Sequence, residues 1–467
     1  METRLEKDSL GEKEIQDNLY YGIHTARSIE NFQISGIKNN SEFIKAIALL
    51  KIACAKANIG LGLLDKKKGS AIISASLEIL NGNLNSQFPL DIFHAGSGTS
   101  LNMNVNEVIA NKALELMQKK KGTKLIHPND HVNMGQSTND IIPSAIRISS
   151  LKLLKNLEKE LKNLIDSLIK KSNEFKYIIK SGRTHLQDAV PITLGQEFHA
   201  YASALSKHLK RLIHCKEFLL YLGIGGNAVG TGLNTRPNFR KLVISHLCQS
   251  TKENFKVTLD GIESTQFLTD VLSLSSSLKL IAVDLNKIAN DLRLLSSGPK
   301  TGFNEIILPA VEPGSSIMPG KTNPSILESL NMVCHKVIGN DTTITISCAS
   351  GQLELNTHMP IIAHSIFESL AILTSSIKNF NHKCIIGILA NKEKCSYYFE
   401  NSMSIATALN PYLGYDKVAE IVKEAIKRNK TIKEMLIEKK IMKKMEIEKI
   451  FNPKSITIPN LTKTVSD

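Results

Sequence analysis

The sequence predicts a mainly α-helical fold, and three observations support this. Aromatic residues make up 5% of the 467 residues and Trp is absent, so the packing must rest on Leu, Ile, Val and Ala, which favours helices over a β-sandwich. The prolines leave long stretches without a helix breaker, at 144–190, 192–236, 238–298, 325–359 and 361–410. No alternation of strands and helices is visible, which argues against a doubly wound α/β fold.

The stretch before Pro299 has the clearest helical period. Apolar residues recur there at alternating spacings of four and three, over about four heptads. They are Phe267, Val271, Leu274, Leu278, Ile281, Leu285, Ile288, Leu292 and Leu295. A shorter stretch repeats the pattern at Leu154, Leu157, Leu161, Leu164 and Leu168. Helices this long usually pack side by side, and often across subunits, so we predict an extended helix bundle.

The element pattern divides the chain into three expected domains. Residues 1–137 form a mixed, mainly helical region, with helical stretches near 41–63 and 102–120. Residues 138–392 form the central long-helix bundle, and residues 393–467 form a small helical domain. Five prolines lie between 299 and 324, so this part of the central region must be a loop.

Composition and charge exclude several classes of protein. Hydrophobic residues at 42% and charged residues at 22% are typical of a soluble globular protein. The net charge of +14 is spread over many lysines without a nucleic-acid-binding motif or a stripe of stacking aromatics, so we expect a solvated Lys-rich surface and no nucleic-acid partner. Such a field would attract a small dianion.

Location and metal content are also constrained. The charged N-terminus has no apolar stretch typical of a signal peptide, and no run of 18 apolar residues predicts a membrane span. The seven cysteines form no CxxC pair and fit no zinc spacing. We therefore expect a cytoplasmic protein with free thiols, without a metal centre and without a membrane partner.

Two glycine motifs are set aside. Gly223–Ala228 resembles the GxGxxA turn of dinucleotide-binding proteins, but the residues before it, 208–222, are typical of a helix end. Gly314–Thr322 resembles a phosphate-binding loop, but five residues separate its glycines and Pro319 removes a backbone donor. A glycine-rich break between two long helices and an ordered loop are the better interpretations.

Three polar segments hold the residues expected to perform chemistry. In the first, Gly96–Asn104 and His131–Asp140, hydroxyl and amide side chains beside glycines can converge on an anion; ordinary helix caps are the alternative. The second, Ser181–Asp188, places His185 beside a hydroxyl, near a cation and an amide. The third, Gly314–Pro324, is typical of an active-site lid, with a plain helix connection as the alternative.

Together these segments resemble the aspartase/fumarase superfamily, which includes the class II fumarases. Gly314–Pro324 is similar to its signature loop, and the resemblance extends from Arg4 to Lys454. Within the superfamily, Tyr20–Thr25, Ser28–Phe32 and Leu186 resemble the ammonia-lyase branch; fumarases usually have Thr where Leu186 stands. The resemblance implies the three-domain superfamily fold, whose central helices form the multi-helix core of a homotetramer with active sites shared between subunits.

The resemblance also implies a reaction, the reversible anti-elimination of ammonia from L-aspartate to give fumarate. A loop serine would remove the Cβ proton, and an aci-carboxylate intermediate would need preorganised donors. The implied general base is Ser315. The implied donors to the developing charge are Thr99, Ser137, Thr138 and Ser316. The α-carboxylate would be bound by Thr184, Lys321 and Asn323. Asn139 and His185 would contact the amino group, and Glu328 would orient His185.

No electrophilic cofactor is implied, and Mg²⁺ is expected at most as an activator. Thr322 and Ser325 stand where the signature loop usually has valines, and Asn227 replaces a usual Thr or Ala. None of the three is expected to touch substrate. Two alternatives stay open: a fumarate hydratase that interconverts malate and fumarate on the same scaffold, and a catalytically inactive, structural member of the superfamily.

Overall fold

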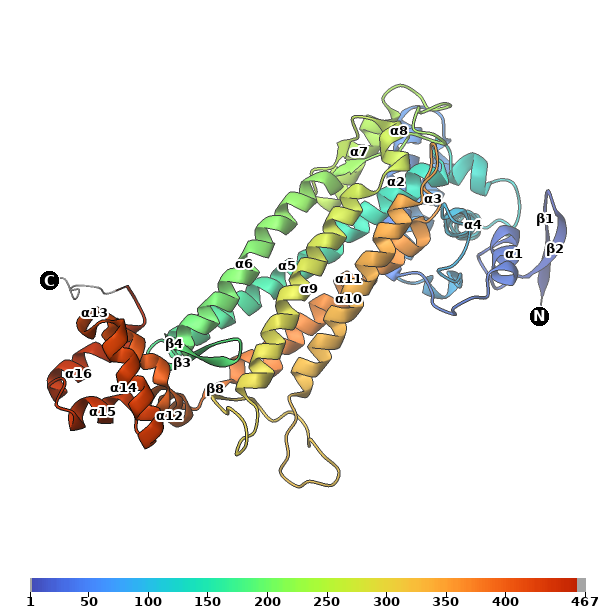
Figure 1. Cartoon of the computed structure of the whole chain (residues 1–467). Helices are drawn as coiled ribbons and strands as arrows, with labels where there is room; N and C mark the ends of the chain where they lie inside the picture. Colours follow the sequence, from blue (N-terminus) through green and yellow to red (C-terminus); the bar gives the residue numbers. More distant parts are fainter. Residues whose placement is uncertain (1, 460–467) are drawn as a thin grey trace. The chain divides into compact units, whose positions relative to one another are not determined.

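The computed structural model describes residues 2–459, and these are predominantly helical (Figure 1). This confirms the predicted mainly α fold. The described residues pack into two compact units. Unit 1 comprises Met1–Glu158, Lys210–Ala282 and His335–Leu373, and unit 2 comprises Lys159–Leu209, Val283–Cys334 and Thr374–Asp467. Both units take segments from the same long helices, so they differ from three consecutive domains, and the division at 137 and 392 stays a prediction.

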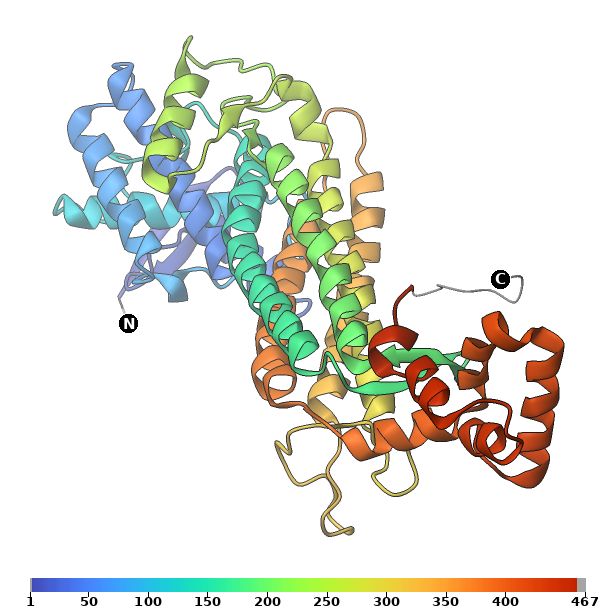
Figure 2. The ribbon, with the colours of Figure 1, turned by 90° about the vertical axis from the view of Figure 1, so that its left-hand side faces the viewer.

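Five long helices dominate the chain. Figures 1 and 2 show segments of them lying side by side within each unit. They are α5 (Thr138–Glu174), α6 (Leu194–Leu219), α9 (Thr269–Leu295), α10 (Ser325–Ala349) and α11 (Met359–Lys383). Each proline-free stretch holds all or most of one of them, as the sequence predicts; α5 and α11 begin a few residues before their stretches.

Two proline-based expectations need correction. The stretch 238–298 holds three helices, because α7 (Phe239–Thr251) and α8 (Gly261–Gln266) precede α9. Pro143 lies inside α5 and does not precede it. Pro143 lies in the second turn, where it removes the backbone hydrogen bond to the carbonyl four residues earlier.

The predicted apolar seam forms the buried side of α9. Val271, Leu274, Leu278, Ile281, Leu285, Ile288, Leu292 and Leu295 are all buried. Phe267 is the exception, at 53% exposure, because it follows α8 in an extended conformation and precedes the first turn of α9. The second predicted seam, Leu154 to Leu168 on α5, is also fully buried. Burial of each such side chain contributes roughly 1.5–3 kcal/mol.

Buried polar pairs fix how the helix segments of unit 1 align. Arg147 Nε of α5 donates to Asp270 Oδ2 of α9 at 2.6 Å. Ser275 Oγ of α9 donates to Asp341 Oδ1 of α10 at 2.8 Å. Because a buried polar group without a partner is costly, these pairs disfavour a shift of one helix along another.

The remaining elements of unit 1 form its N-terminal part and its loops. The helical stretches expected near 41–63 and 102–120 are α2 and α4. The bounds are β1 (Thr3–Asp8), β2 (Gly11–Gln16), α1 (Ile23–Asn31), α2 (Ser41–Gly60), α3 (Lys66–Leu80), η1 (Asn85–Gln87), α4 (Thr99–Leu116), η2 (Pro128–Val132), β5 (Tyr221–Leu222) and β6 (Lys256–Val257).

Unit 2 ends in a cluster of short helices, as expected for the residues from about 393 onward. Its core includes Phe399, Leu409, Ile421, Met435 and Phe451, and it also takes Ile179 from a strand. The last part of that expected domain, 460–467, lies outside the described residues. The bounds are η3 (Ile385–Gly387), α12 (Lys392–Asn401), η4 (Met403–Leu409), α13 (Asn410–Leu413), α14 (Tyr415–Arg428), α15 (Ile432–Glu438), α16 (Lys444–Ile450) and α17 (Pro453–Ile456).

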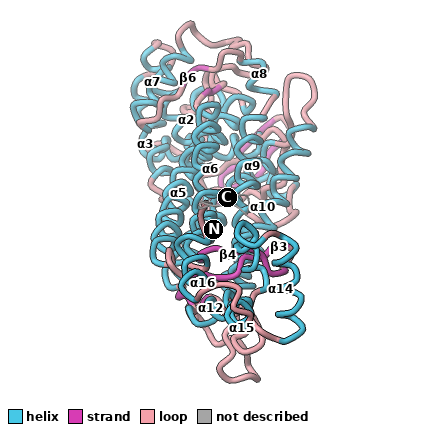
Figure 3. Tube along the Cα trace, turned by 60° about the vertical axis from the view of Figure 1, so that its left-hand side comes forward, coloured by secondary structure: helices cyan, strands magenta, loops and turns pink. Residues whose placement is uncertain are grey.

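Strands are few and short in the described chain (Figure 3). In unit 1, β1 pairs with β2 antiparallel and β5 pairs with β6 in parallel. In unit 2, β7 (Ile306–Ile307) pairs antiparallel with β8 (Leu389–Ala390), and β3 (Ile179–Thr184) pairs antiparallel with β4 (Gln187–Thr193). A continuous parallel sheet, which a doubly wound fold requires, is not found among residues 2–459.

One helical segment, Met359–Gly387, is long and apolar enough to cross a membrane. The sequence-based search for a continuous apolar run did not detect it, because polar residues interrupt the segment. In the structure 61% of its most apolar window is buried inside the protein. Burial of this kind is typical of a core helix, and the cytoplasmic location stays a prediction.

A buried ion cluster anchors the β3–β4 hairpin in unit 2. Glu305 is fully buried, and its carboxylate lies 2.8 Å from Lys180 Nζ and 2.9 Å from Arg183 Nη1. Lys180 also pairs with Glu197 of α6 at 2.9 Å. The Arg183 guanidinium lies 4.2 Å from the ring centre of Phe303. The base of the hairpin is therefore held on several sides.

Replacing Glu305 should destabilise the protein strongly. Glu305→Gln keeps the shape but leaves two cations without their shared carboxylate, so we expect a loss of about 3–5 kcal/mol. The control is Glu312→Gln, because Glu312 is exposed and a surface charge contributes little. Chemical denaturation of both variants measures the difference, and equal stability of the two would contradict the assigned role.

Candidate active site

Side-chain hydrogen bonds cap the start of α5. Ser137 Oγ accepts from Asn139 N at 3.2 Å, and Asp140 Oδ1 accepts from Ser137 N at 2.9 Å. Ser is among the residues favoured at the N-cap of a helix because its oxygen can accept such a bond. The helix-cap interpretation is therefore correct for this segment, and it presents Ser137, Thr138 and Asn139 together on the first turn.

The start of α4 lies beside the start of α5. Gly98 has φ +90°, and a Cβ there would lie 2.8 Å from the side chain of Ile142. Asn102 Nδ2, in the first turns of α4, donates to Thr138 Oγ1 at 3.2 Å. Thr99 is the first residue of α4, and its hydroxyl bonds that of Ser97 at 2.8 Å. Two helix N-termini with hydroxyl side chains therefore converge, which favours a bound anion.

The glycine-rich segment after α6 completes this corner of unit 1. Asp140 Oδ2 accepts from Gly225 N at 3.0 Å and from Asn227 N at 2.8 Å. Asn139 Nδ2 donates to the Ala228 carbonyl at 2.8 Å. Only the two-residue strand β5 precedes the segment, and helix α7 begins as late as Phe239. The dinucleotide-binding interpretation is excluded by this layout, and the glycines instead allow close packing around Asp140.

A buried lysine lies behind the two helix starts. Lys51 of α2 is fully buried, and its Nζ donates to Asn102 Oδ1 at 2.9 Å and to Asn133 Oδ1 at 2.8 Å. Burial lowers the pKa of Lys51 to about 7. Burial raises the pKa of Asp140 to about 7, against the effect of its three backbone donors. The sequence analysis missed Lys51, because one Lys within a helical pattern gives no signal of burial.

The second polar segment is the tip of the β3–β4 hairpin in unit 2. Thr184 pairs with Gln187, so His185 and Leu186 form a two-residue turn. Both have positive φ, 54° and 60°. Turns of this kind normally use Asn or Gly, because other side chains are strained at positive φ. Strain of this sort is often found at functional sites, and it presents His185 at an exposed tip.

The third polar segment is a loop between α9 and α10 that projects from the ends of these helices (Figure 1). Ser315 Oγ accepts from Met318 N at 3.2 Å and from Ile317 N at 3.3 Å. Gly314 N donates to the Lys321 carbonyl at 2.8 Å, which closes the loop at its base. A Cβ on Gly314 would lie 2.5 Å from that same carbonyl oxygen, so the closure needs glycine.

The other predicted residues of unit 2 lie near that loop. Ser316, Lys321 and Asn323 are exposed, and Asn323 Nδ2 donates to the Gly314 carbonyl at 2.6 Å. Glu328 lies in the first turn of α10, with Oε1 3.7 Å from Arg293 Nη2. Within residues 2–459 no hydrogen bond or ion pair joins Glu328 to His185, and none joins the hairpin tip to the loop. The orientation of His185 by Glu328 stays a prediction.

The predicted residues therefore form two groups within one chain. The structure brings four of them together in unit 1, at the starts of α4 and α5; they are Thr99, Ser137, Thr138 and Asn139. The other seven are in unit 2, on the hairpin tip and in or just after the loop; they are Thr184, His185, Ser315, Ser316, Lys321, Asn323 and Glu328. In the part of the chain that is described, no group of three or more His, Cys, Asp or Glu residues is placed to hold a metal ion. Activation by Mg²⁺ stays a prediction.

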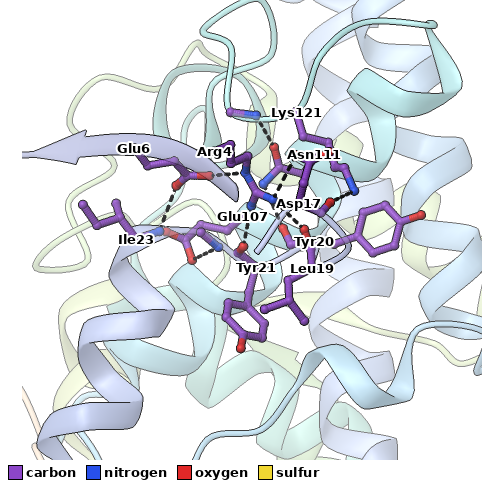
Figure 4. Close-up of polar contacts among 12 residues, drawn as sticks. Arg4, Glu6, Asp17, Leu19, Tyr20, Tyr21, Ile23, Glu107, Asn111 and Lys121 are labelled. Carbon is purple, nitrogen blue, oxygen red and sulfur yellow. Dashed lines mark hydrogen bonds and ion pairs between the residues drawn. The ribbon is translucent and has the colours of Figure 1, made fainter. Parts of the chain in front are cut away.

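The segment 20–32 is held by a buried carboxylate that the sequence analysis did not single out (Figure 4). Glu107 of α4 accepts from Gly22 N and His24 N, both at 2.9 Å, and from Thr25 N at 3.1 Å. Thr25 Oγ1 donates to the same carboxylate at 2.6 Å. Burial raises the pKa of Glu107, and these four donors oppose the rise. Glu107 thus caps the start of α1.

Arg4 holds the other side of this segment. Its Nη1 donates to the Leu19 carbonyl and its Nη2 to the Tyr21 carbonyl, both at 2.8 Å (Figure 4). Farther along α1, Ser28 Oγ donates to Ser100 Oγ at 3.1 Å, one residue after Thr99. The segment that distinguishes the ammonia-lyase branch is therefore fixed directly against the start of α4.

Comparison with known proteins identifies the family of the chain. A family model described as lyase matches residues 11–339, and one described as fumarase C C-terminus matches residues 405–457. An aspartate ammonia-lyase of Helicobacter pylori is 46% identical over 467 residues, which cover 99% of this chain and 100% of that protein. A class II fumarate hydratase of Thermosynechococcus vestitus is 45% identical over 434 residues, which cover 92% of this chain and 93% of that protein.

A solved structure is similarly close. The crystal structure described as fumarate lyase:delta crystallin from Brucella melitensis bound to cobalt has a TM-score of 0.95 and 44% identity, covering 98% of this chain and 100% of that chain. The two named activities differ by a single percentage point of overall identity. Local residues must therefore discriminate between them.

Replacing Glu107 should loosen α1 selectively. Glu107→Gln turns an amide NH₂ toward backbone N–H groups, and hydrogen bonds to a charged group contribute about 1.5–3 kcal/mol each, so we expect a loss of roughly 3 kcal/mol. Hydrogen exchange of the amides of residues 22–25 should become faster. The control on the same helix is Glu115→Gln, which breaks only exposed pairs with Lys112 and Tyr20. Unchanged exchange in Glu107→Gln would refute the capping role.

Proposed function

The chain belongs to the lyase family that contains the aspartases and the class II fumarases, and on that premise we propose that it converts L-aspartate reversibly into fumarate and ammonia. Relatives named aspartate ammonia-lyase match it at 44–46% identity over 98–99% of the chain. The residues at Tyr20–Phe32 and Leu186 support the same choice, because they resemble the ammonia-lyase branch.

The observation that carries the proposed mechanism is the environment of Ser315. A serine hydroxyl does not ionise near neutral pH, so it can act as a base only where its alkoxide is stabilised. Ser315 Oγ accepts two backbone N–H bonds, from Ile317 and Met318, at 3.3 and 3.2 Å. Both donors lie in the same loop turn, and closure of the loop over substrate would remove water and strengthen them. We assign Cβ proton abstraction to this hydroxyl.

The starts of α4 and α5 would stabilise the charge that proton abstraction creates. Removing the Cβ proton places a second negative charge on the β-carboxylate, and the resulting aci-carboxylate needs fixed donors. Thr99, Ser137 and Thr138 lie at two converging helix N-termini, whose partial positive charges favour an anion. Ser316 of the loop would add a fourth hydroxyl.

The remaining groups would hold the rest of the substrate. Lys321 and Asn323 of the loop, with Thr184 of the hairpin, are suited to the α-carboxylate, since Lys321 is exposed and has no ion pair among the described residues. Asn139 and His185 would contact the leaving amino group. No cofactor takes part in this scheme.

We further propose that the enzyme is a homotetramer in which subunits share active sites. The strained hairpin tip supports this, because Leu186 is 66% exposed beside His185, and a partner subunit could cover this apolar side chain. Large apolar side chains are also exposed on α9 and α10; they include Leu280, Val283, Met332 and Ile346. Apolar patches along long helices commonly mark subunit contacts.

A second candidate function is hydration of fumarate to malate. It is favoured by the relative named class II fumarate hydratase, whose 45% identity is nearly that of the aspartate ammonia-lyases. The two reactions share the aci-carboxylate and differ in the leaving group. A structural, inactive protein is less well supported, since the residues expected to act are all present.

Substrate choice is tested by following fumarate formation by ultraviolet absorbance. We expect fumarate from L-aspartate and not from L-malate, because Leu186 and the segment 20–32 resemble the ammonia-lyase branch. Fumarate from L-malate alone would instead establish the hydratase.

Ser315→Ala should lower kcat by about 10²–10⁴-fold, the usual contribution of a general base. Thr322→Val, in the same loop but away from substrate, should keep activity; equal losses in both variants would contradict the role of Ser315.

Shared active sites are tested by mixing inactive variants. Ser315→Ala and His185→Ala each carry one defect, so a mixed tetramer with sites built from several subunits should regain some activity at sites that receive neither defect. Light scattering should report four chains for each variant. Four chains without regained activity, after subunit exchange is verified, would show that Ser315 and His185 of one site come from the same subunit, which contradicts a site that divides them between subunits.

A further inference from the structure

Lys51 is placed unusually for a buried lysine. The described residues contain three buried lysines, and two of them pair with carboxylates: Lys180 with Glu197 and Glu305, and Lys171 with Glu174. Lys51 has no carboxylate within 4 Å among these residues and bonds only to two amide oxygens. A buried cation without an ion pair costs several kcal/mol, so a merely structural position would favour an apolar residue.

The charged groups around Lys51 are few. Asp140 of α5 and Cys54 of α2 are the groups whose charges act on it. Asp140 already accepts three backbone N–H bonds, from Ser137, Gly225 and Asn227, and Cys54 is a buried thiol whose pKa burial raises. Neither is a hydrogen-bond partner of the ammonium group.

Protonated Lys51 fixes the orientation of the amide groups next to it. An ammonium group only donates, so in this form Lys51 Nζ requires the oxygens of Asn102 and Asn133 to face it, as they do in the structure. The NH₂ group of Asn102 must then point the other way, and it lies 3.2 Å from Thr138 Oγ1. The Thr138 oxygen therefore accepts, and its own hydrogen is left to donate elsewhere.

We propose that Lys51 is a positioning residue that, through Asn102, makes the Thr138 hydroxyl a hydrogen-bond donor toward a carboxylate bound at the starts of α4 and α5. This inference rests on the proposed function, since it gives Thr138 the developing aci-carboxylate as its acceptor. The link between Lys51 and Thr138 is the Asn102 amide, whose oxygen faces Lys51 and whose NH₂ group faces Thr138. Lys51 itself does not touch substrate.

The proposal requires Lys51 and Thr138 to act as one unit. Lys51→Met removes the ammonium and keeps the length, so Asn102 is free to rotate and Thr138 loses its fixed direction. We expect kcat for L-aspartate to fall about 10–100-fold with a smaller change in KM, because the donor matters most when charge develops. Thr138→Val should lower kcat comparably, and the double variant should be no worse than the poorer single variant.

A double-mutant cycle separates this role from a structural one. Loss of packing at Lys51 would add to the effect of Thr138→Val, whereas an action through Thr138 gives non-additive effects on log kcat. Lys171→Met is the matched control, since it also removes a buried lysine, and its effect should add to that of Thr138→Val. If Lys51→Met does not fold, Lys51→Gln carries the same cycle, because its amide both donates and accepts and therefore no longer fixes the orientation of Asn102.

The outcomes distinguish this inference from the proposed function. Wild-type protein without activity on L-aspartate or L-malate overturns both. Active wild-type protein with additive effects of Lys51→Met and Thr138→Val overturns the role of Lys51 alone. Active protein with non-additive effects at Lys51 and additive effects at Lys171 supports it, with either substrate, because both substrates have the same β-carboxylate.

Discussion

Apolar side chains along α9 and α5 are withdrawn from water over the whole length of each helix, and this burial determines where neighbouring segments can lie. A helix that is packed along its length cannot shift without exposing a row of Leu and Ile, and buried pairs such as Arg147–Asp270 oppose such a shift as well. The predicted site residues lie outside the packed helix faces: at the starts of α4, α5 and α10, in the loop between α9 and α10, and at the tip of the β3–β4 hairpin.

Helix ends also supply the electrostatics. The starts of α4 and α5 meet through the Asn102–Thr138 hydrogen bond, and each contributes the partial positive charge of a helix N-terminus. The Lys51 amino group lies behind them, bonded to amide oxygens and not to a carboxylate. The loop around Ser315 repeats the device on a smaller scale, with two backbone donors on one hydroxyl. The proposed anion binding therefore draws on backbone and amide groups whose positions the sequence does not reveal, together with the predicted hydroxyls and Lys321.

Much of the fold could be predicted from apolar periodicity and from the positions of helix-breaking prolines. The seam from Val271 to Leu295 and the five long helices were predicted, because an apolar repeat of 3.5 residues is typical of a long helix with one buried side. Errors arose where local rules compete. Phe267 fits the repeat but precedes the helix, and Pro143 lies inside α5. In Met359–Gly387, scattered polar residues interrupt a segment that is apolar on average. These boundaries depend on caps and turns and not on the period.

The sequence by itself indicated the three polar segments from their residue types, and the resemblance of those segments to a known superfamily predicted the family and an elimination reaction. Tertiary structure alone decided the rest: that Glu107 caps α1, that Lys51 is buried without a counter-ion, and that His185 stands on a strained turn. The physical reason is that burial, dihedral angle and hydrogen-bond direction are relations between distant segments. In the sequence, a lysine that will be buried looks the same as one that will be exposed to water. Only the packing of distant segments distinguishes the two.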